Sequence, residues 1–346
     1  MNNTFTIKET NEAKGVACML LLLHHLFYSE SKWGMFYSIG GINPPLIAIA
    51  ANVGKVCVAM FIFLSGYGLA KSAEKSGESG IKFVYRHMVK LMCKYWFVFI
   101  IFVPLGFVFG RSPIDVYGNN GKGILRFIID FLGLSNLAGT ATMNATWWYM
   151  GAIICLYIMF PILYKGIKNM SILTLITLII TAGLCFFSDG TRWKHALLLW
   201  IFPFTVGIYI SVIGLFDKIM DKKKLCIICS IVCIGISLLL RYKIGVKADT
   251  FLGIGIIIFT VSIFSYSKWI ENGLELIGRH AANIFMMHTF IYAYYSQGII
   301  YKLWYPSLIY IVLLSVCLVI SIGLEKFKEL IKYEKLQRFL LKIAED

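Results

Sequence analysis

The chain has 346 residues, of which 59% are hydrophobic and 15% are charged, and its mean hydropathy is +0.77. Soluble proteins keep about a quarter of their residues charged, so this composition excludes an ordinary soluble domain. The net charge of +15 does not indicate nucleic-acid binding. No basic stretch carries a soluble domain of its own, and cytoplasmic loops of membrane proteins are rich in basic residues for topological reasons.

Long apolar segments predict an all-α, polytopic membrane protein of about ten transmembrane helices. The segments are residues 15–29, 48–70, 95–110, 147–165, 172–187, 196–215, 225–241, 250–266, 281–299 and 306–324. About two thirds of the lysines and arginines fall in one alternate set of connecting segments, which predicts cytoplasmic N- and C-termini. The N-terminus has no small-residue cleavage site after the first apolar segment, so we expect that segment to remain as a spanning helix.

The first predicted span carries two histidines, His24 and His25, after four leucines. With about 100° and 1.5 Å per helical residue, His25 lies within ~20° of Lys14 and ~16 Å further along the axis. His24 lies ~80° off that line. Polar residues inside spans tend to mark function or internal pairing. We therefore favour His25 over His24, with contact to headgroups or water as the alternative for both.

The second predicted span ends in the segment FIFLSGYGLA, residues 61–70. Its Ser-Gly-Tyr-Gly run permits close backbone approach and a helix break. Ser65 and Tyr67 are the polar side chains in this run, and both are candidates for the lining of a site.

A basic stripe precedes the third predicted span. Lys82, Arg86, Lys90 and Lys94 recur every four residues, which places them on one face of a helix. Fixed cations at a cytoplasmic membrane edge suit a phosphorylated ligand. Anchoring to anionic lipid headgroups needs the same residues and is the alternative.

Three later segments carry further landmarks. Residues 124–139 are apolar but interrupted by Asp130 and Gly133, which predicts a re-entrant or interfacial helix. Trp148 lies among aromatic residues typical of a membrane interface. His288 lies two turns inside the span that begins at residue 281, where internal hydrogen bonding is the alternative to catalysis.

The sequence shows neither a linker nor a repeat, so we expect one transmembrane domain over residues 1–324. Residues 325–346 alternate basic and apolar residues at helical spacing, which predicts an amphipathic segment on the cytoplasmic membrane surface. The nine cysteines fall within or at the edges of apolar stretches. Cys226, Cys229 and Cys233 share a helix face, but no histidine or acid is near in sequence, so packing is expected and no metal.

Taken in chain order, these segments resemble the membrane-bound acyltransferase-3 family, whose members O-acylate cell-surface glycans and related molecules. KGVACMLLLLHH resembles the first-helix pattern, with Lys14 and His25 at its basic and histidine positions. FIFLSGYGLA, FVYRHMVKLMCKYW, WWYMGAIICLYIMFPIL, FPFTVGIYI and LIGRHAANIFMMHTFI resemble later landmarks. His87 and Val89 stand where many members have arginine, and no hydrolase-like extracytoplasmic domain follows the last span.

The resemblance implies transfer of an acyl group, most often acetyl, from cytoplasmic acyl-CoA to a hydroxyl of a surface glycan or related acceptor. It implies that Arg86 and Lys90, with Lys82 and Lys94 in reserve, hold the CoA phosphates. Lys14 would orient the donor and His25 would act as general base. Ser65, Tyr67 and Trp148 are candidates for oxyanion donor, and His288 for the pocket lining. The acceptor, acyl length and oligomeric state stay open.

Two other functions fit the same sequence. An exporter or flippase of a polysaccharide or other surface molecule is also compatible with about ten spans, central histidines and broken helices. A membrane sensor or scaffold that binds partners through residues 325–346 is the third reading, although it gives Lys14 and His25 no role. By family analogy, we expect a multi-pass protein of a bacterial plasma membrane, in contact with membrane lipids.

Overall fold

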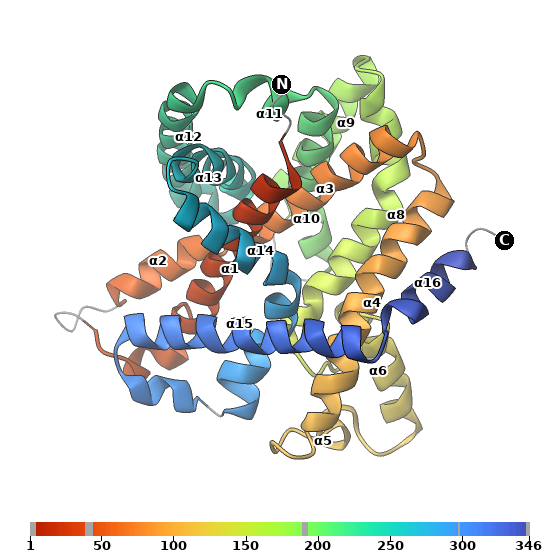
Figure 1. Cartoon of the computed structure of the whole chain (residues 1–346), viewed down its shortest axis with the longest axis vertical. Helices are drawn as coiled ribbons and strands as arrows, with labels where there is room; N and C mark the ends of the chain where they lie inside the picture. The colour runs from red at the N-terminus through yellow and green to blue at the C-terminus, as the bar shows by residue number, and fades with distance from the viewer. Residues whose placement is uncertain (1–4, 39–43, 189–192, 297, 344–346) are drawn as a thin grey trace. The chain divides into compact units, whose positions relative to one another are not determined.

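A computed structural model describes residues 5–38, 44–188, 193–296 and 298–343. The described residues form helices and turns and include no strand, which confirms the all-α prediction. The α-helices (Figure 1) are α1 Ile7–Phe27, α2 Leu46–Gly54, α3 Cys57–Ser76, α4 Ile81–Leu105, α5 Pro113–Tyr117, α6 Gly121–Phe131, α7 Ser135–Ala138, α8 Trp148–Lys168, α9 Ile172–Phe187, α10 Trp193–Val212, α11 Leu215–Ile219, α12 Lys223–Ile244, α13 Asp249–Phe264, α14 Lys268–Thr289, α15 Pro306–Leu330 and α16 Glu334–Lys342.

Among the described residues, five helical segments are long and apolar enough to cross a membrane. They are Leu46–Ser76, Ile81–Leu105, Ala145–Lys168, Lys223–Phe264 and Pro306–Leu330. Two shorter apolar helices, Ile172–Phe187 and Leu197–Val212, coincide with predicted spans. The chain is therefore a membrane protein, whereas the prediction of about ten spans with both termini cytoplasmic stays a prediction.

The chain divides into two compact units. Unit 1 comprises residues 1–20, 55–84 and 155–281, and unit 2 comprises residues 21–54, 85–154 and 282–346. Each unit is described by itself below.

Unit 1 is organised around the close packing of α3 against α10, which lie side by side in Figure 1. A Cβ added at Gly66 would lie 2.2 Å from the carbonyl oxygen of Phe204. One added at Gly207 would lie 2.2 Å from the carbonyl oxygen of Phe63. Small residues at such positions let helix backbones approach within a membrane. The glycine of the Ser-Gly-Tyr-Gly run therefore has a packing function.

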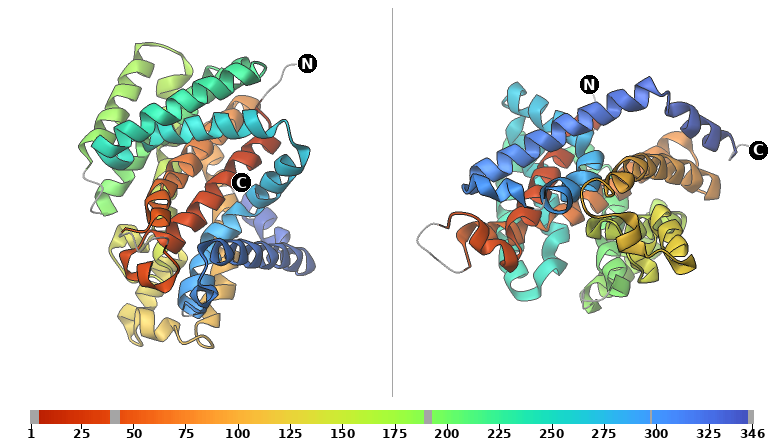
Figure 2. Two further views of the ribbon diagram at one scale, coloured as in Figure 1. Left: turned by 90° about the vertical axis from the view of Figure 1, so that its left-hand side faces the viewer. Right: turned by 90° about the horizontal axis from the view of Figure 1, so that it is seen from below.

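Polar groups of unit 1 are tied together by ion pairs. Lys71 of α3 contacts Asp217 of α11 at 2.8 Å, and the same carboxylate accepts a hydrogen bond from the backbone N–H of Phe5. Arg241 and Asp249 pair at 2.7 Å between α12 and α13, whose neighbouring course is visible in Figure 2. In the buried Arg241–Asp249 pair each charge depends on the other, because removing one partner would leave an uncompensated buried charge.

Unit 2 contains the segment predicted to be re-entrant, residues 124–139. Its helix is interrupted near Asp130 and Gly133, as the sequence indicated. α6 ends at Phe131, Gly133 adopts a positive φ of 73°, and α7 begins at Ser135. The buried carboxylate of Asp130 accepts hydrogen bonds from the Tyr117 hydroxyl at 2.5 Å and from the Ser135 hydroxyl at 2.8 Å. Burial raises the pKa of Asp130 above its usual range. This carboxylate fixes the turn between two short helices.

The C-terminal part of unit 2 is a long helix followed by a short one (Figure 2). α15 continues without a break past residue 325, the expected start of the amphipathic segment, and ends at Leu330. The hydroxyl of Tyr333 donates to the carbonyl of Cys93 at 3.0 Å, and that of Tyr85 donates to the carbonyl of Leu340 at 3.1 Å. The C-terminal segment is thus held against α4 within unit 2.

The glycine pair in α3 provides a matched test of the α3–α10 contact. Gly66→Ala should lower the free energy of unfolding by about 1–3 kcal/mol, because the new methyl group meets backbone that cannot move aside. Gly68→Ala should be neutral or stabilising, because nothing lies within 4 Å of its Cβ position. Thermal unfolding in detergent measures both, and equal unfolding temperatures for the two variants would contradict the packing.

Candidate functional site

The imidazoles of His25 and His288 face each other in unit 2. His25 lies in the last turn of α1 and His288 in the last turn of α14. Their ring centroids are 4.9 Å apart, with the ring planes tilted by 52°. Two histidines from distant parts of the sequence therefore meet in one place.

His288 is held in a defined orientation by backbone groups. Its Nδ1 lies 3.0 Å from the carbonyl oxygen of Ile284 and 2.9 Å from that of Phe285. Carbonyl oxygens only accept hydrogen bonds, so Nδ1 carries the proton and Nε2 of the neutral ring is an acceptor. The Thr289 hydroxyl lies 3.2 Å from this Nε2.

A lysine completes the cluster. The ammonium of Lys32, in the 3₁₀ helix Glu30–Met35, donates to the carbonyl oxygen of His25 at 2.6 Å and to the Tyr292 hydroxyl at 3.3 Å. It also lies 4.6 Å from the centroid of the Tyr292 ring, in a cation–π contact. Burial lowers the pKa of Lys32 to about 8. A cation that loses its proton readily is thus fixed at the end of α1.

His24 points to different partners, as the helical phase predicted. Its Nδ1 lies 2.9 Å from the carbonyl oxygen of Ala51 in α2, and its ring stacks on Tyr28 with centroids 4.8 Å apart. The rings of His24 and His25 meet edge to face at 5.2 Å. Of the two histidines, His25 is the one that faces His288.

The end of α14 is anchored by the segment that precedes α8. The side-chain amide of Asn144 and the indole of Trp147 both donate to the carbonyl oxygen of Met286, at 3.1 and 3.0 Å. Thr289 lies 3.4 Å from Thr146 through their hydroxyls. Beyond Thr289 the chain forms a π-helical stretch, Phe290–Tyr295. Such stretches frequently occur at functional sites.

Trp148, a predicted pocket residue, is linked to the same region through rings. Its ring lies 6.2 Å from that of Tyr149, which contacts Phe285 at 4.9 Å. Phe285 in turn lies 6.4 Å from the His288 ring. Trp148 is therefore part of the aromatic surroundings of the histidine pair.

The other predicted residues of the site belong to unit 1. Lys14 lies in α1, the helix that also carries His25, as the sequence predicted. The Ser65 hydroxyl donates to the carbonyl oxygen of Phe61 at 2.9 Å. Tyr67 is 3% exposed among aromatic rings, and its hydroxyl has no hydrogen-bond partner among the described residues. Lys82, at the start of α4, is exposed.

The rest of the basic stripe lies in the part of α4 that belongs to unit 2. Lys90 and Lys94 are exposed, while Arg86 is half-buried. Glu325 of α15 accepts a hydrogen bond from Lys328 at 2.7 Å and also interacts electrostatically with Lys94. The basic residues thus share one face of α4, and Lys94 among them has the acidic neighbour Glu325.

Lys32 and Tyr292 are residues of this cluster that the sequence did not single out. Lys32 lies in the polar segment that follows the first predicted span. In sequence it cannot be told from a lysine that contacts lipid headgroups. Tyr292 lies among other aromatics near the end of a span. Only the fold brings them to His25 and His288.

In the described part of the chain, no group of three or more His, Cys, Asp or Glu side chains is arranged to hold a metal ion. The thiol of Cys226 contacts the carbonyl of Ile219 at 3.1 Å, and Cys229 is exposed.

The comparison with known proteins identifies the family. A family model described as an acyltransferase domain matches residues 11–326, which is most of the chain. The protein therefore belongs to the membrane-bound acyltransferase-3 family, as the sequence motifs indicated. No curated protein and no solved structure matches the chain.

The lowered pKa of Lys32 leads to a direct measurement. Because burial disfavours the ammonium, the side chain should be charged below about pH 8 and neutral above it. Labelling with a small amine-reactive reagent, followed by mass spectrometry at a series of pH values, should show half-maximal modification of Lys32 near pH 8. In Lys32→Arg the modified peptide should be absent, which confirms that the label is on Lys32. A midpoint near ~10.4, the ordinary lysine value, would contradict the burial described here.

Proposed function

We propose that this protein is an integral membrane O-acyltransferase that moves an acyl group, most simply acetyl, from acyl-CoA to a hydroxyl of a surface glycan or related acceptor. The observation that carries the proposal is the His25–His288–Lys32 cluster in a chain of the acyltransferase-3 family. A bacterial plasma membrane is the proposed location.

His25 is the proposed general base. A neutral imidazole can take the proton of an acceptor hydroxyl as the oxygen attacks the thioester carbon. When the tetrahedral intermediate collapses, the C–S bond breaks, and the imidazolium returns the proton to the departing CoA sulfur, which releases the ester and CoA–SH. The Lys32 ammonium at the end of α1 disfavours a second positive charge beside it, which suits a neutral imidazole as the proposed base. The proton of His288 is fixed on Nδ1, which orients its ring. This ring faces that of His25 and would hold it in position.

The basic stripe is the proposed donor site. Arg86 and Lys90, with Lys82 and Lys94, would bind the phosphates of CoA at the cytoplasmic surface, because phosphate oxygens favour fixed cationic donors. Lys14 would orient the donor along α1 toward His25. The exposure of Lys82, Lys90 and Lys94 is compatible with this role and equally with contact to lipid headgroups.

The tetrahedral intermediate requires a hydrogen-bond donor for its oxyanion. The Ser65 hydroxyl is already directed to the carbonyl of Phe61, so it is the weaker candidate. Tyr67, whose hydroxyl is unpartnered among the described residues, is a second candidate, and Trp148 is a third. The Lys32 ammonium joins them because it already lies at His25.

The two histidines give a matched pair of variants. In purified protein supplied with radiolabelled acetyl-CoA and glycan acceptors, His25→Ala should reduce acyl transfer by at least ~100-fold, the usual contribution of a general base. His24→Ala should retain most of the turnover at saturating acceptor, because the His24 Nδ1 is held at the carbonyl of Ala51 and its ring stacks on Tyr28, so it is not placed to act as the base.

Two outcomes would contradict this assignment. Transfer that survives His25→Ala would remove His25 from the chemistry. Movement of a glycan across the membrane without any acyl-CoA requirement would favour the exporter alternative.

A further inference from the structure

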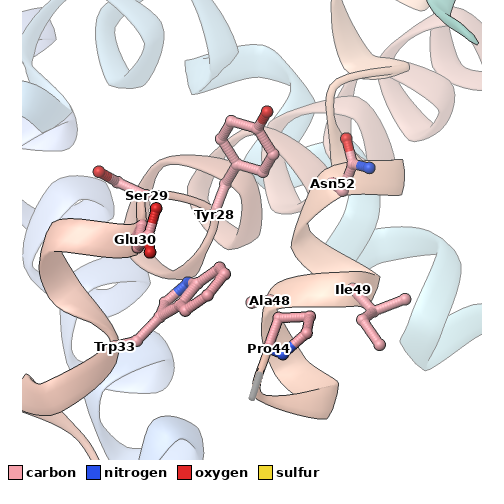
Figure 3. Close-up of a pocket in the computed structure, with 8 residues that line it drawn as sticks. All are labelled: Tyr28, Ser29, Glu30, Trp33, Pro44, Ala48, Ile49 and Asn52. Carbon is pink, nitrogen blue, oxygen red and sulfur yellow. The ribbon is translucent and has the colours of Figure 1, made fainter.

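A cavity of about 500 Å³ opens in unit 2 at the end of α1 (Figure 3). Tyr28, Glu30 and Trp33, which follow α1, line one side. Ala48, Ile49 and Asn52 of α2 line the other side. Its volume is within the ~300–1,000 Å³ typical of small-molecule sites.

The walls of this cavity are fixed by contacts of His24 and Trp33. His24 stacks on Tyr28 and lies 2.9 Å from the carbonyl oxygen of Ala51, so one ring braces both walls. The indole N–H of Trp33 donates to the carbonyl oxygen of Phe27 at 3.3 Å, which holds its ring in place. A site with such supports is preorganised for a ligand.

The lining has a distinctive chemistry. Tyr28 and Trp33 offer aromatic faces, on which the C–H face of a sugar ring packs, while the carboxylate of Glu30 and the amide of Asn52 offer partners for hydroxyl groups. Among the described lining residues Glu30 is the charged one, and none is basic. A ligand that carries a carboxylate or phosphate would therefore meet a like charge and no counter-ion.

We propose that this cavity is a subsite for a neutral sugar ring of an extended acceptor, next to the ring whose hydroxyl reaches His25. Tyr28 of the lining stacks on His24, with ring centroids 4.8 Å apart, and the His24 ring lies 5.2 Å from that of His25. One histidine ring therefore separates the cavity wall from the proposed base, which suits a sugar ring adjacent to the reacting one. The assignment to an acceptor rests on the proposed function, whereas sugar binding itself needs no acyl-CoA.

The binding test uses saturation-transfer NMR on purified full-length protein in detergent, without acyl-CoA. The probes are the methyl glycosides of glucose, galactose and N-acetylglucosamine, with methyl glucuronide as the anionic match. We expect signals from neutral glycosides and at least a fivefold weaker signal from the glucuronide. Trp33→Ala and Asn52→Leu should each reduce the neutral signals at least fivefold.

Control variants show whether a lost signal comes from the cavity. Trp269→Ala, which removes an indole that is 85% exposed in α14, should leave the signals unchanged. Glu30→Gln should raise the signal of the glucuronide toward that of the neutral glycosides. Asn52→Leu alters an exposed side chain and so covers the case in which Trp33→Ala unfolds.

Three results would overturn the proposal. The first is that the unmodified protein binds no neutral glycoside, and the second is that it binds the glucuronide as well as the neutral glycosides. The third is that Asn52→Leu and Trp269→Ala give equal signals for the neutral glycosides. None of them bears on acyl transfer at His25. Sugar binding without any acyl transfer would instead leave the subsite standing and remove the proposed reaction.

Discussion

The structure depends on one constraint, that polar groups within apolar helices need partners inside the protein. Water is absent from the hydrocarbon core of a bilayer, so an unpaired donor or charge there costs several kcal/mol. His288 meets this constraint with two backbone carbonyls, and His24 meets it with the carbonyl of Ala51. His25 differs, because its contacts are the rings of two other histidines, while Lys32 binds its carbonyl oxygen.

That difference is the basis for separating the two histidines. A backbone carbonyl bound to Nδ1 fixes the tautomer of a histidine and leaves Nε2 as the hydrogen-bond acceptor, as in His288. The His25 ring instead contacts the rings of His24 and His288, and it lies beside a lysine of lowered pKa. The cluster thus combines two imidazoles and a cation at the end of one helix. This is the type of arrangement in which acyl transfer needs its base and its electrostatic support.

Much of this was predictable from local sequence patterns, and the remainder depended on tertiary contacts. Helical phase placed His25 and His24 on different sides of α1, and the break at Gly133 followed from that glycine and Asp130. The partners of His25 were not predictable, because His288 and Lys32 come from a distant helix and from a polar connection without a motif. The start of α14 was not predictable either. The helix begins at Lys268 with polar turns, which carry no apolar signal, and continues into the apolar segment predicted from residue 281. Likewise, the hydrogen bond that engages Ser65 depends on its rotamer, which the Ser-Gly-Tyr-Gly pattern does not specify.

The central claim is that one centre at His25 joins a donor from one side of the membrane to an acceptor on the other. Sealed vesicles with uniformly oriented protein test it directly, with radiolabelled acetyl-CoA inside and a glycan acceptor outside. Labelled acceptor should appear outside the vesicles while CoA stays inside. Label that reaches the acceptor only when both substrates are on the same side would contradict it.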